Sequence, residues 1–213
     1  MGCKGRRVLV TSGPAAVAID DVRVITNRST GEMGRLVAGA LHAKGYCVTL
    51  LEGSAATSRL PLPEAIDLKK FFFYDELDQA LVRELRKGHD IVIHAAAVPD
   101  FRPSRAFRGK MFSGNELTLK LVPTKKLIEK IKKIAPGSFL VGFKLAARKF
   151  SGRFPANVKG LFDQAACDLV VANVSHDGEY QACLFGPRGR LSPDGLTKKA
   201  LVTVLTDTID LRS

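Results

Sequence analysis

The sequence predicts an α/β protein with a Rossmann-like, doubly wound, mostly parallel sheet, helices on both faces and a C-terminal hairpin. Short apolar runs alternate with stretches of helical spacing along the chain, which is typical of a parallel sheet covered on both faces. The length of 213 residues and the hydrophobic content of 46% allow a substantial core. We therefore expect residues 1–213 to form a single domain.

The first half of the chain is expected to run strand, helix, strand, helix, strand. These elements are predicted at residues 6–13, 33–44, 46–53, 75–87 and 90–98. Apolar residues recur at helical spacing in both helices, and each helix stops at a glycine suited to a C-cap, Gly45 or Gly88. The Pro-containing stretch 54–70 is expected to be a connector.

A long loop is expected after the third strand, at residues 99–116. It holds four positive charges, two Pro and two Gly without a sustained period, which favours a mobile segment. Loops at the carboxyl ends of parallel strands are where open α/β sheets bind ligands. The elements expected after it are strand 116–122, helix 123–134, strand 137–145, helix 155–166, strand 167–174, a hairpin at 180–190 and helix 195–211.

Composition excludes several classes of protein. No run of eighteen apolar residues appears and the start lacks a signal-peptide cleavage pattern, so we expect a cytoplasmic protein without membrane association. The four cysteines are far apart and have no His partners at metal spacing. We therefore expect neither zinc nor disulfides, and interpret Cys47, Cys167 and Cys183 as partly buried thiols.

The net charge of +12 leaves one alternative function, a basic nucleic-acid-binding module on a Rossmann-like frame. The densest group of charges, five lysines between 125 and 133, fits the solvated face of a helix. No aromatic residues interleave with it as stacking platforms would require. Nucleic acid is therefore not the expected partner.

The first Gly turn, TSGPAA, lacks the G-x-G-x-x-G spacing of a dinucleotide fingerprint, and Glu52 at the end of the second strand is a weak substitute. An NAD(P)-dependent reductase is thus a second, disfavoured alternative. A Walker A motif is also absent, so a triphosphate would need another binding device.

The segment NRSTGEMG, residues 27–34, is the candidate for that device. It places Asn27, Ser29, Thr30 and Gly31 just before a helix, where free backbone N–H groups can bind an anion without a lysine. The same pattern also fits an ordinary capped helix start. Local chemistry leaves both interpretations open.

Several segments in order resemble the phosphopantothenoylcysteine synthetases, the phosphopantothenate–cysteine ligases. They are IDDVRVITNRSTGEMG, HAAAVPDFRP, the Gly109–Lys110 pair followed by ELTLKLVPT, VGFKL and CDLVVAN, and they span nearly the whole chain. The chain is similar to the stand-alone form, which is not fused to a flavin-dependent decarboxylase.

The resemblance implies roles for individual residues. Asn27 and Lys110 would be catalytic, the first in amide formation and the second as a loop lysine that reaches the phosphates. The implied nucleotide-binding positions are His94, Ala95, Ala96, Asp100, Lys110, Val122, Pro123, Thr124, Lys125 and Phe143. The implied substrate-binding positions are Arg23, Asn27, Ser29, Thr30 and Gly31, with Arg23 acting across a subunit interface.

The resemblance further implies CTP as co-substrate, with ATP possible, Mg²⁺ on its phosphates and a homodimer with a shared site. The metal ligands stay open. Two family lysines are replaced by Leu161 and Ala165, so that charge is missing here unless Lys144 or Lys159 substitutes for it. Pro14–Ala15 and Ala146 also depart from the family pattern, which bears on nucleotide choice more than on reaction class.

Overall fold

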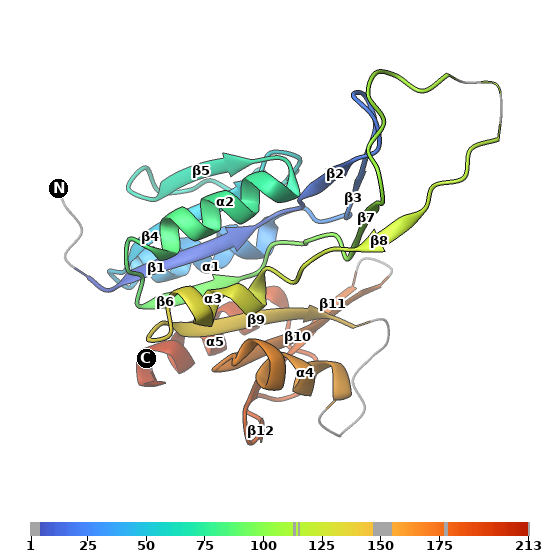
Figure 1. Ribbon diagram of the computed structural model, residues 1–213. Coiled ribbons are helices and arrows are strands. Elements are labelled where there is room, and N and C mark those ends of the chain that lie inside the picture. The colour runs from blue at the N-terminus through green and yellow to red at the C-terminus, as the bar shows by residue number, and fades with distance from the viewer. Residues whose placement is uncertain (1–4, 113, 115, 147–154, 177–178, 213) are drawn as a thin grey trace.

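The computed structural model describes residues 5–112, 114, 116–146, 155–176 and 179–212. Its centre is one eight-stranded sheet flanked by helices, which confirms the predicted α/β class (Figure 1). The sheet strands are β1 (Arg7–Ser12), β4 (Cys47–Gly53), β5 (Asp67–Phe71), β6 (Ile91–His94), β9 (Phe139–Leu145), β10 (Leu169–His176), β11 (Glu179–Gly186) and β12 (Gly189–Arg190). The helices are α1 (Glu32–Ala43), α2 (Tyr74–Leu85), α3 (Ile128–Ile134), α4 (Ala156–Ala165) and α5 (Lys198–Arg212).

The strand order is β12-β11-β10-β9-β6-β1-β4-β5. All neighbours from β5 to β10 are parallel, and β11 and β12 add an antiparallel edge, which is the expected C-terminal hairpin. The chain leaves β1 toward β4 and β5 and later returns to β6 on the other side. The order therefore reverses between β1 and β6, and a ligand crevice is expected at their carboxyl ends.

Each face of the sheet has its own apolar core. Helices α1 and α5 cover one face, where Val37, Leu41 and Leu205 pack on the strands. Helices α2, α3 and α4 cover the other face, through residues such as Leu81 and Ile131 (Figure 1). Because both faces are covered, the inner strands are nearly continuous apolar runs.

Strand β5 lies within the stretch 54–70 and beyond it, which the sequence indicated only as connector; this prediction was wrong. The strand sits at the sheet edge and exposes Asp67, Leu68 and Lys70. Charged residues on an edge strand discourage pairing with other chains, but they also remove the apolar pattern that would identify it.

Two small hairpins project from the carboxyl end of the sheet (Figure 1). One pairs β2 (Ala16–Ala18) with β3 (Val24–Thr26), and the other pairs β7 (Phe101–Pro103) with β8 (Leu121–Pro123). The stretch 99–116, expected to be loop throughout, thus contains β7, and its residues 113 and 115 lie outside the described residues. We call the segment from β7 to β8 the arm; its mobility stays a prediction.

Cysteine chemistry differs from the expectation at one position. Cys167 and Cys183 are free and buried, as expected, and burial raises the pKa of both thiols, to about 12 and about 11. Cys47 is disulfide-bonded, so both its interpretation as a thiol and the expectation of no disulfides were wrong. Within the described residues, no helix is long and apolar enough to cross a membrane.

Candidate functional site

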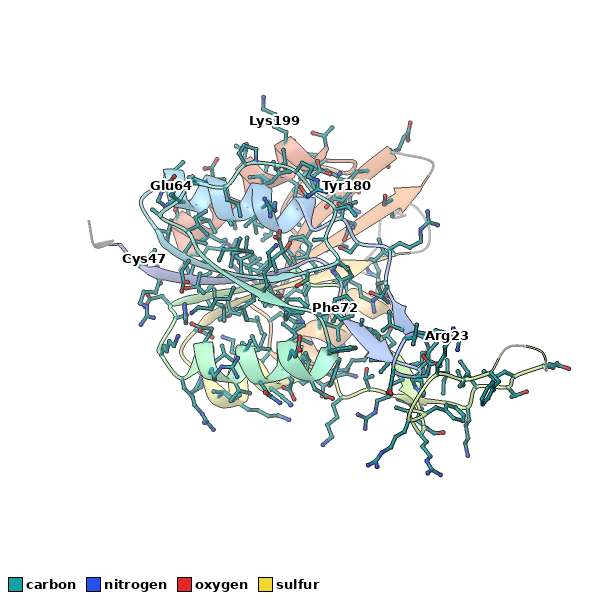
Figure 2. The ribbon with its side chains drawn as sticks, turned by 90° about the horizontal axis from the view of Figure 1, so that it is seen from above. Arg23, Cys47, Glu64, Phe72, Tyr180 and Lys199 are labelled. Atoms are coloured by element: carbon teal, nitrogen blue, oxygen red, sulfur yellow. The ribbon has the colours of Figure 1, made fainter. Side chains whose placement is uncertain are left out.

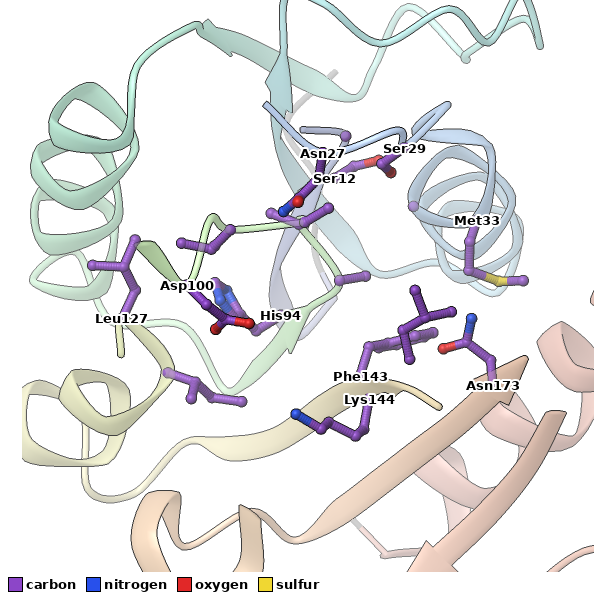
Figure 3. A pocket seen from close by; sticks show the side chains of 18 of the residues that line it. Ser12, Asn27, Ser29, Met33, His94, Asp100, Leu127, Phe143, Lys144 and Asn173 are labelled. Atoms are coloured by element: carbon purple, nitrogen blue, oxygen red, sulfur yellow. The ribbon is translucent and has the colours of Figure 1, made fainter. Parts of the chain in front are cut away.

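A cleft of about 910 Å³ lies at the carboxyl ends of β1, β6, β9 and β10, at the reversal in strand order. Its walls are the start of α1, the segment after β6, and the ends of β9 and β10 (Figure 3). Residues from many separate chain segments converge there, which is the usual construction of a ligand site in an open α/β sheet.

The turn before α1 forms the upper wall of this cleft. Gly31 caps the helix with φ of +76°, a left-handed conformation that glycine adopts without strain. The Ser12 hydroxyl donates a hydrogen bond of 2.8 Å to the Gly31 carbonyl and so fixes the turn against β1. The N–H groups of the first helical turn have no carbonyl partner within the helix, so this wall can bind an anion.

Close approach of α1 to β1 depends on Gly34. A Cβ atom at this position would lie 2.2 Å from the Ser12 Oγ and 2.3 Å from the Ser12 Cβ. Real contacts of this kind are essentially never below 3.0 Å, so any larger residue would push the helix start away from the strand.

His94 ends β6 at the floor of the cleft and is 7% exposed. Its Nδ1 lies 3.0 Å from the Thr11 Oγ1, and the same oxygen accepts the Ala96 N–H at 3.1 Å. Burial lowers the pKa of His94 to about 4, so its imidazole is neutral at pH 7. The Thr11 hydroxyl therefore holds both the neutral His94 ring and the backbone N–H of Ala96 at the floor of the cleft.

The segment from Pro99 to Lys126 borders the other side of the cleft. The Asp100 carboxylate forms an ion pair with Lys126. The Thr124 hydroxyl donates to the Pro99 carbonyl at 2.6 Å, and the Thr124 N–H donates to the Asp100 carbonyl at 2.9 Å. These bonds hold the start of α3 beside the strand end of β6.

The structure distinguishes the two lysines proposed to replace the missing family charges. Lys144 lies in β9 and lines the cleft together with Leu161 of α4 (Figure 3 labels Lys144). Lys159 does not line it and forms an ion pair of 3.1 Å with Asp163 on the exposed side of α4. Lys144 is therefore the one of the two in a position to contact a ligand.

Most residues singled out from the sequence meet in this cleft. Those that line it are Asn27, Ser29, Thr30, Gly31, His94, Ala95, Ala96, Asp100, Thr124, Lys125 and Phe143. Four others do not: Arg23, Lys110, Val122 and Pro123. Val122 and Pro123 are part of β8 at the base of the arm.

Arg23 and Lys110 lie on the projecting hairpins instead. Arg23 forms an ion pair of 2.6 Å with the buried carboxylate of Asp20, and that carboxylate also accepts the Met111 N–H at 3.1 Å. The backbone N–H groups of Met111, Val22 and Arg23, with a smaller effect of the Arg23 guanidinium, lower the pKa of Asp20 to about 2 against the opposing effect of desolvation. Asp20 therefore fastens the arm segment next to Lys110 onto the β2–β3 hairpin; Figure 2 labels Arg23 at this end of the molecule.

Other cleft residues were not identified from the sequence. They include Ser12, Met33, Asn173, Ser175 and Lys198. Ser12 and Asn173 occupy the ends of predicted strands, so attention to polar residues at strand ends could have found them. Lys198 comes from the last helix, and no local signal links it to the cleft.

Glu52 cannot act as the acidic residue of a dinucleotide site. Its carboxylate is fully buried and binds the Arg35 guanidinium through two bonds of 2.6 and 2.7 Å, with Lys70 as a further partner. These cations lower the pKa of Glu52 against the opposing effect of burial. A ribose hydroxyl has no access to this group, which argues against the NAD(P)-dependent reductase.

Three lysines in and before α3 form ion pairs with acidic side chains, whereas the sequence indicated a lysine-rich helix face in contact with solvent. Lys130 pairs with Asp78 at 2.6 Å and Lys132 with Asp168 at 2.7 Å. Because Lys126 is also paired, these cations are already balanced locally.

The fold and cleft define a doubly wound α/β protein with a cleft at the switch point of its sheet. Residues 3–184 match the family described as DNA/pantothenate metabolism flavoprotein, C-terminal domain. The chain belongs to this family, and the family resemblance inferred from the sequence is confirmed.

Curated relatives agree with this assignment. The chain is 34% identical over 211 residues to the coenzyme A biosynthesis bifunctional protein CoaBC of Thermococcus kodakarensis, covering 97% of this chain and 51% of that protein. It is 31% identical over 170 residues to CoaBC of Methanocaldococcus jannaschii, covering 80% and 41%. The chain thus spans about half the length of the curated relatives it matches.

Solved structures share the fold. The DNA/pantothenate metabolism flavoprotein of Streptococcus pneumoniae superposes with a TM-score of 0.86 at 24% identity, covering 98% of this chain and 100% of that one. A Cab2 variant in complex with phosphopantothenate-cysteine gives 0.73 at 18% identity, covering 96% and 87%. At these identities the likeness supports the fold alone.

Proposed function

We propose that the protein is a cytoplasmic ligase that forms the amide bond between 4'-phosphopantothenate and L-cysteine in coenzyme A biosynthesis. The reaction uses CTP, with ATP as the alternative, and passes through an acyl-nucleotidylate. The observation that carries the proposal is the convergence of the Asn27–Gly31 turn with the His94–Asp100 segment in one cleft. The names of the curated relatives add support.

The first step needs preorganised positive charge because both reactants are anions. The phosphopantothenate carboxylate attacks the α-phosphorus of the triphosphate, and the bond to pyrophosphate breaks. The helix start near Gly31 can bind phosphate oxygens, and Lys144 and Lys125 bring cations to the same cleft. His94 beneath them is neutral, so the positive charge in the cleft comes from the lysines and the helix start.

Mg²⁺ fits this site as a phosphate-bound ion. Among the described residues, no group of three or more His, Cys, Asp or Glu could form a protein cage for a metal. Mg²⁺ commonly uses one or two carboxylates together with substrate phosphates, and Asp100 at the cleft offers such a carboxylate. When bound, the ion would neutralise phosphate charge.

The second step transfers the acyl group to the cysteine amine. The amine nitrogen attacks the acyl carbonyl, the nucleoside monophosphate leaves with the bonding electrons, and the amine loses a proton. Asn27 lies on the cleft wall beside the turn, where its side-chain amide can donate to the developing oxyanion.

A direct test supplies the purified protein with phosphopantothenate, cysteine and each of the four nucleoside triphosphates. Pyrophosphate, nucleoside monophosphate and phosphopantothenoylcysteine are measured in each mixture. We expect the three products in equal amounts, with CTP giving the highest rate. Absence of amide product with every triphosphate would contradict the proposed function, and release of nucleoside diphosphate with inorganic phosphate would contradict the acyl-nucleotidylate.

Lys110→Ala is expected to slow pyrophosphate release roughly ten- to a hundredfold, because it removes a cation that the arm delivers to the phosphates. Lys110 lies outside the cleft here, next to the Gly109 N–H that donates to Asp21 at 2.8 Å. The arm must therefore move, or approach the cleft of a partner subunit, for Lys110 to act.

Lys120→Ala is the matched control for this variant, since Lys120 is an exposed lysine of the same arm. We expect it to retain the wild-type rate of pyrophosphate release. Equal rates for the two variants would remove Lys110 from the first step.

We further propose a homodimer in which each site is completed by Arg23 of the partner subunit. Arg23 lies outside the cleft of its own chain, on a hairpin that projects from the sheet. The hairpin and the arm expose large apolar side chains, namely Val22, Phe101, Phe107, Phe112, Leu117 and Leu121. A patch of this kind on a projecting segment is suited to contact with a second subunit.

Mixing two inactive variants tests the shared site. We expect Arg23→Ala and Asn27→Ala to lack amide formation separately but to regain roughly a quarter of wild-type activity after co-refolding in equal amounts. Half of the dimers would be mixed, and each mixed dimer would hold one intact site of two. No recovery in dimers shown to be mixed would place Arg23 and Asn27 of one site on the same chain.

A further inference from the structure

A group of polar side chains lines the cleft between α1, β10 and α5 and has no part in the steps described above. Glu32 begins α1, Lys198 begins α5, and Asn173 lies in β10, at the last residue paired with β9. Lys198 forms an ion pair with Glu32, and its Nζ lies 5.6 Å from the centre of the Tyr180 ring. All four residues line the cleft.

The position of Lys198 is not explained by the stability of its own helix. A cation at a helix N-terminus opposes the helix macrodipole, and α5 has no acidic residue in its first turn. The ammonium is held instead by Glu32 and the Tyr180 ring, which come from distant parts of the chain. The tertiary structure thus places a cation at this wall of the cleft.

The ion pair remains open to a ligand. The side chains of Lys198 and Glu32 are 36% and 34% exposed. Pairs with this degree of exposure contribute little net stability, so a ligand that satisfies both charges can insert between them at small cost.

Asn173 adds a hydrogen-bonding group to the same wall. Its side chain points into the space between β10 and α1 (Figure 3). The amide forms no hydrogen bond with the described residues, and so both its N–H donors and its carbonyl oxygen are available to a ligand.

We propose that Lys198, Glu32 and Asn173 form the subsite that binds the amino-acid substrate as a zwitterion. Lys198 and the Asn173 amide bind the α-carboxylate, and Glu32 binds the α-ammonium group and accepts the proton that the nitrogen must lose before it can attack. A phosphate or a lone carboxylate would match Lys198 but would be repelled by Glu32, whereas an amino acid carries both complementary charges. This inference rests on the proposed ligase function and names the residues that select its amine substrate.

The test compares L-cysteine with cysteamine, which has the same amine and thiol but no carboxylate. For Lys198→Met we expect kcat/KM for cysteine to fall roughly ten- to a hundredfold while the value for cysteamine is unchanged, because only the bond to the carboxylate is lost. Lys199→Met is the matched control: Lys199 is the next residue, and its side chain points away from the molecule (Figure 2). It should leave both values unchanged.

Glu32→Gln is expected to affect the two amines equally, unlike Lys198→Met. We expect it to lower kcat/KM for cysteine and for cysteamine by similar factors, because both substrates carry the amine. Pyrophosphate release measured without amine should stay at the wild-type rate in both variants, which shows that they are folded and bind the first substrates.

An unchanged ratio of cysteine to cysteamine in Lys198→Met, with amide still formed, would overturn the subsite while leaving the ligase intact. A wild-type protein that forms no amide from either amine would overturn the ligase itself.

Discussion

Asn27→Ala is expected to lower amide formation roughly a hundred- to a thousandfold while pyrophosphate release in the first step stays near the wild-type rate. The reason is that a donor aimed at a developing oxyanion matters most in the step in which the carbonyl becomes tetrahedral. Asn27 lies at the cleft wall and is exposed, so its side chain can reach an acyl group that binds in the cleft. Single-turnover assays that follow pyrophosphate and amide separately would show the uncoupling of the two steps.

Gln79→Ala serves as its control, because it removes an exposed side-chain amide from α2, away from the cleft. This variant should be indistinguishable from wild type in both assays. If Asn27→Ala formed amide at the wild-type rate, Asn27 would have no part in the second step. If it lost pyrophosphate release to the same degree, its role would lie in nucleotide binding.

Gly34→Ala is expected to lower the free energy of unfolding by about 1–3 kcal/mol and to abolish most activity. The new Cβ would lie 2.2 Å from the Ser12 Oγ, and Ser12 is buried at the end of a central strand with no room to yield. Relief requires a shift of α1, which would break the Ser12 bond to Gly31 and distort the anion-binding turn. Urea denaturation and the pyrophosphate assay measure the two effects.

Gly39→Ala in the same helix gives the opposite expectation. A Cβ at Gly39 would meet no atom within 4 Å, so the change should raise stability by about 0.5–1 kcal/mol through helix propensity. Its activity should match wild type. Equal stability of the Gly34 and Gly39 variants would show that the contact between α1 and Ser12 is not close in solution.

The central elements and much of the cleft were predictable because their signals are local. The buried strand at Arg7–Ser12 is a continuous apolar run, and α1 shows helical spacing with a glycine at each end. His94 lies within the predicted strand 90–98 and Asp100 follows it, so parallel-sheet geometry places both toward the same edge as Asn27.

What the sequence did not reveal depends on contacts between distant segments. The β2–β3 strands are three residues each and pair only across a hairpin, too short for a periodic pattern. Lys198 reaches the cleft because α5 packs beside α1, a contact between residues 166 positions apart that no local motif records. The location of Lys110 outside the cleft likewise results from hydrogen bonds to the β2–β3 hairpin.

Asp20 has a consequence for how the projecting hairpins respond to ligands. One buried carboxylate accepts hydrogen bonds from the backbone of Val22, Arg23 and Met111 and pairs with the Arg23 guanidinium. Asp20 therefore joins the tip of the β2–β3 hairpin to the part of the arm next to Lys110 at a single point. Any movement that carries Lys110 into the cleft must either move Arg23 with it or break these bonds. Moving one of the two residues without the other therefore costs free energy.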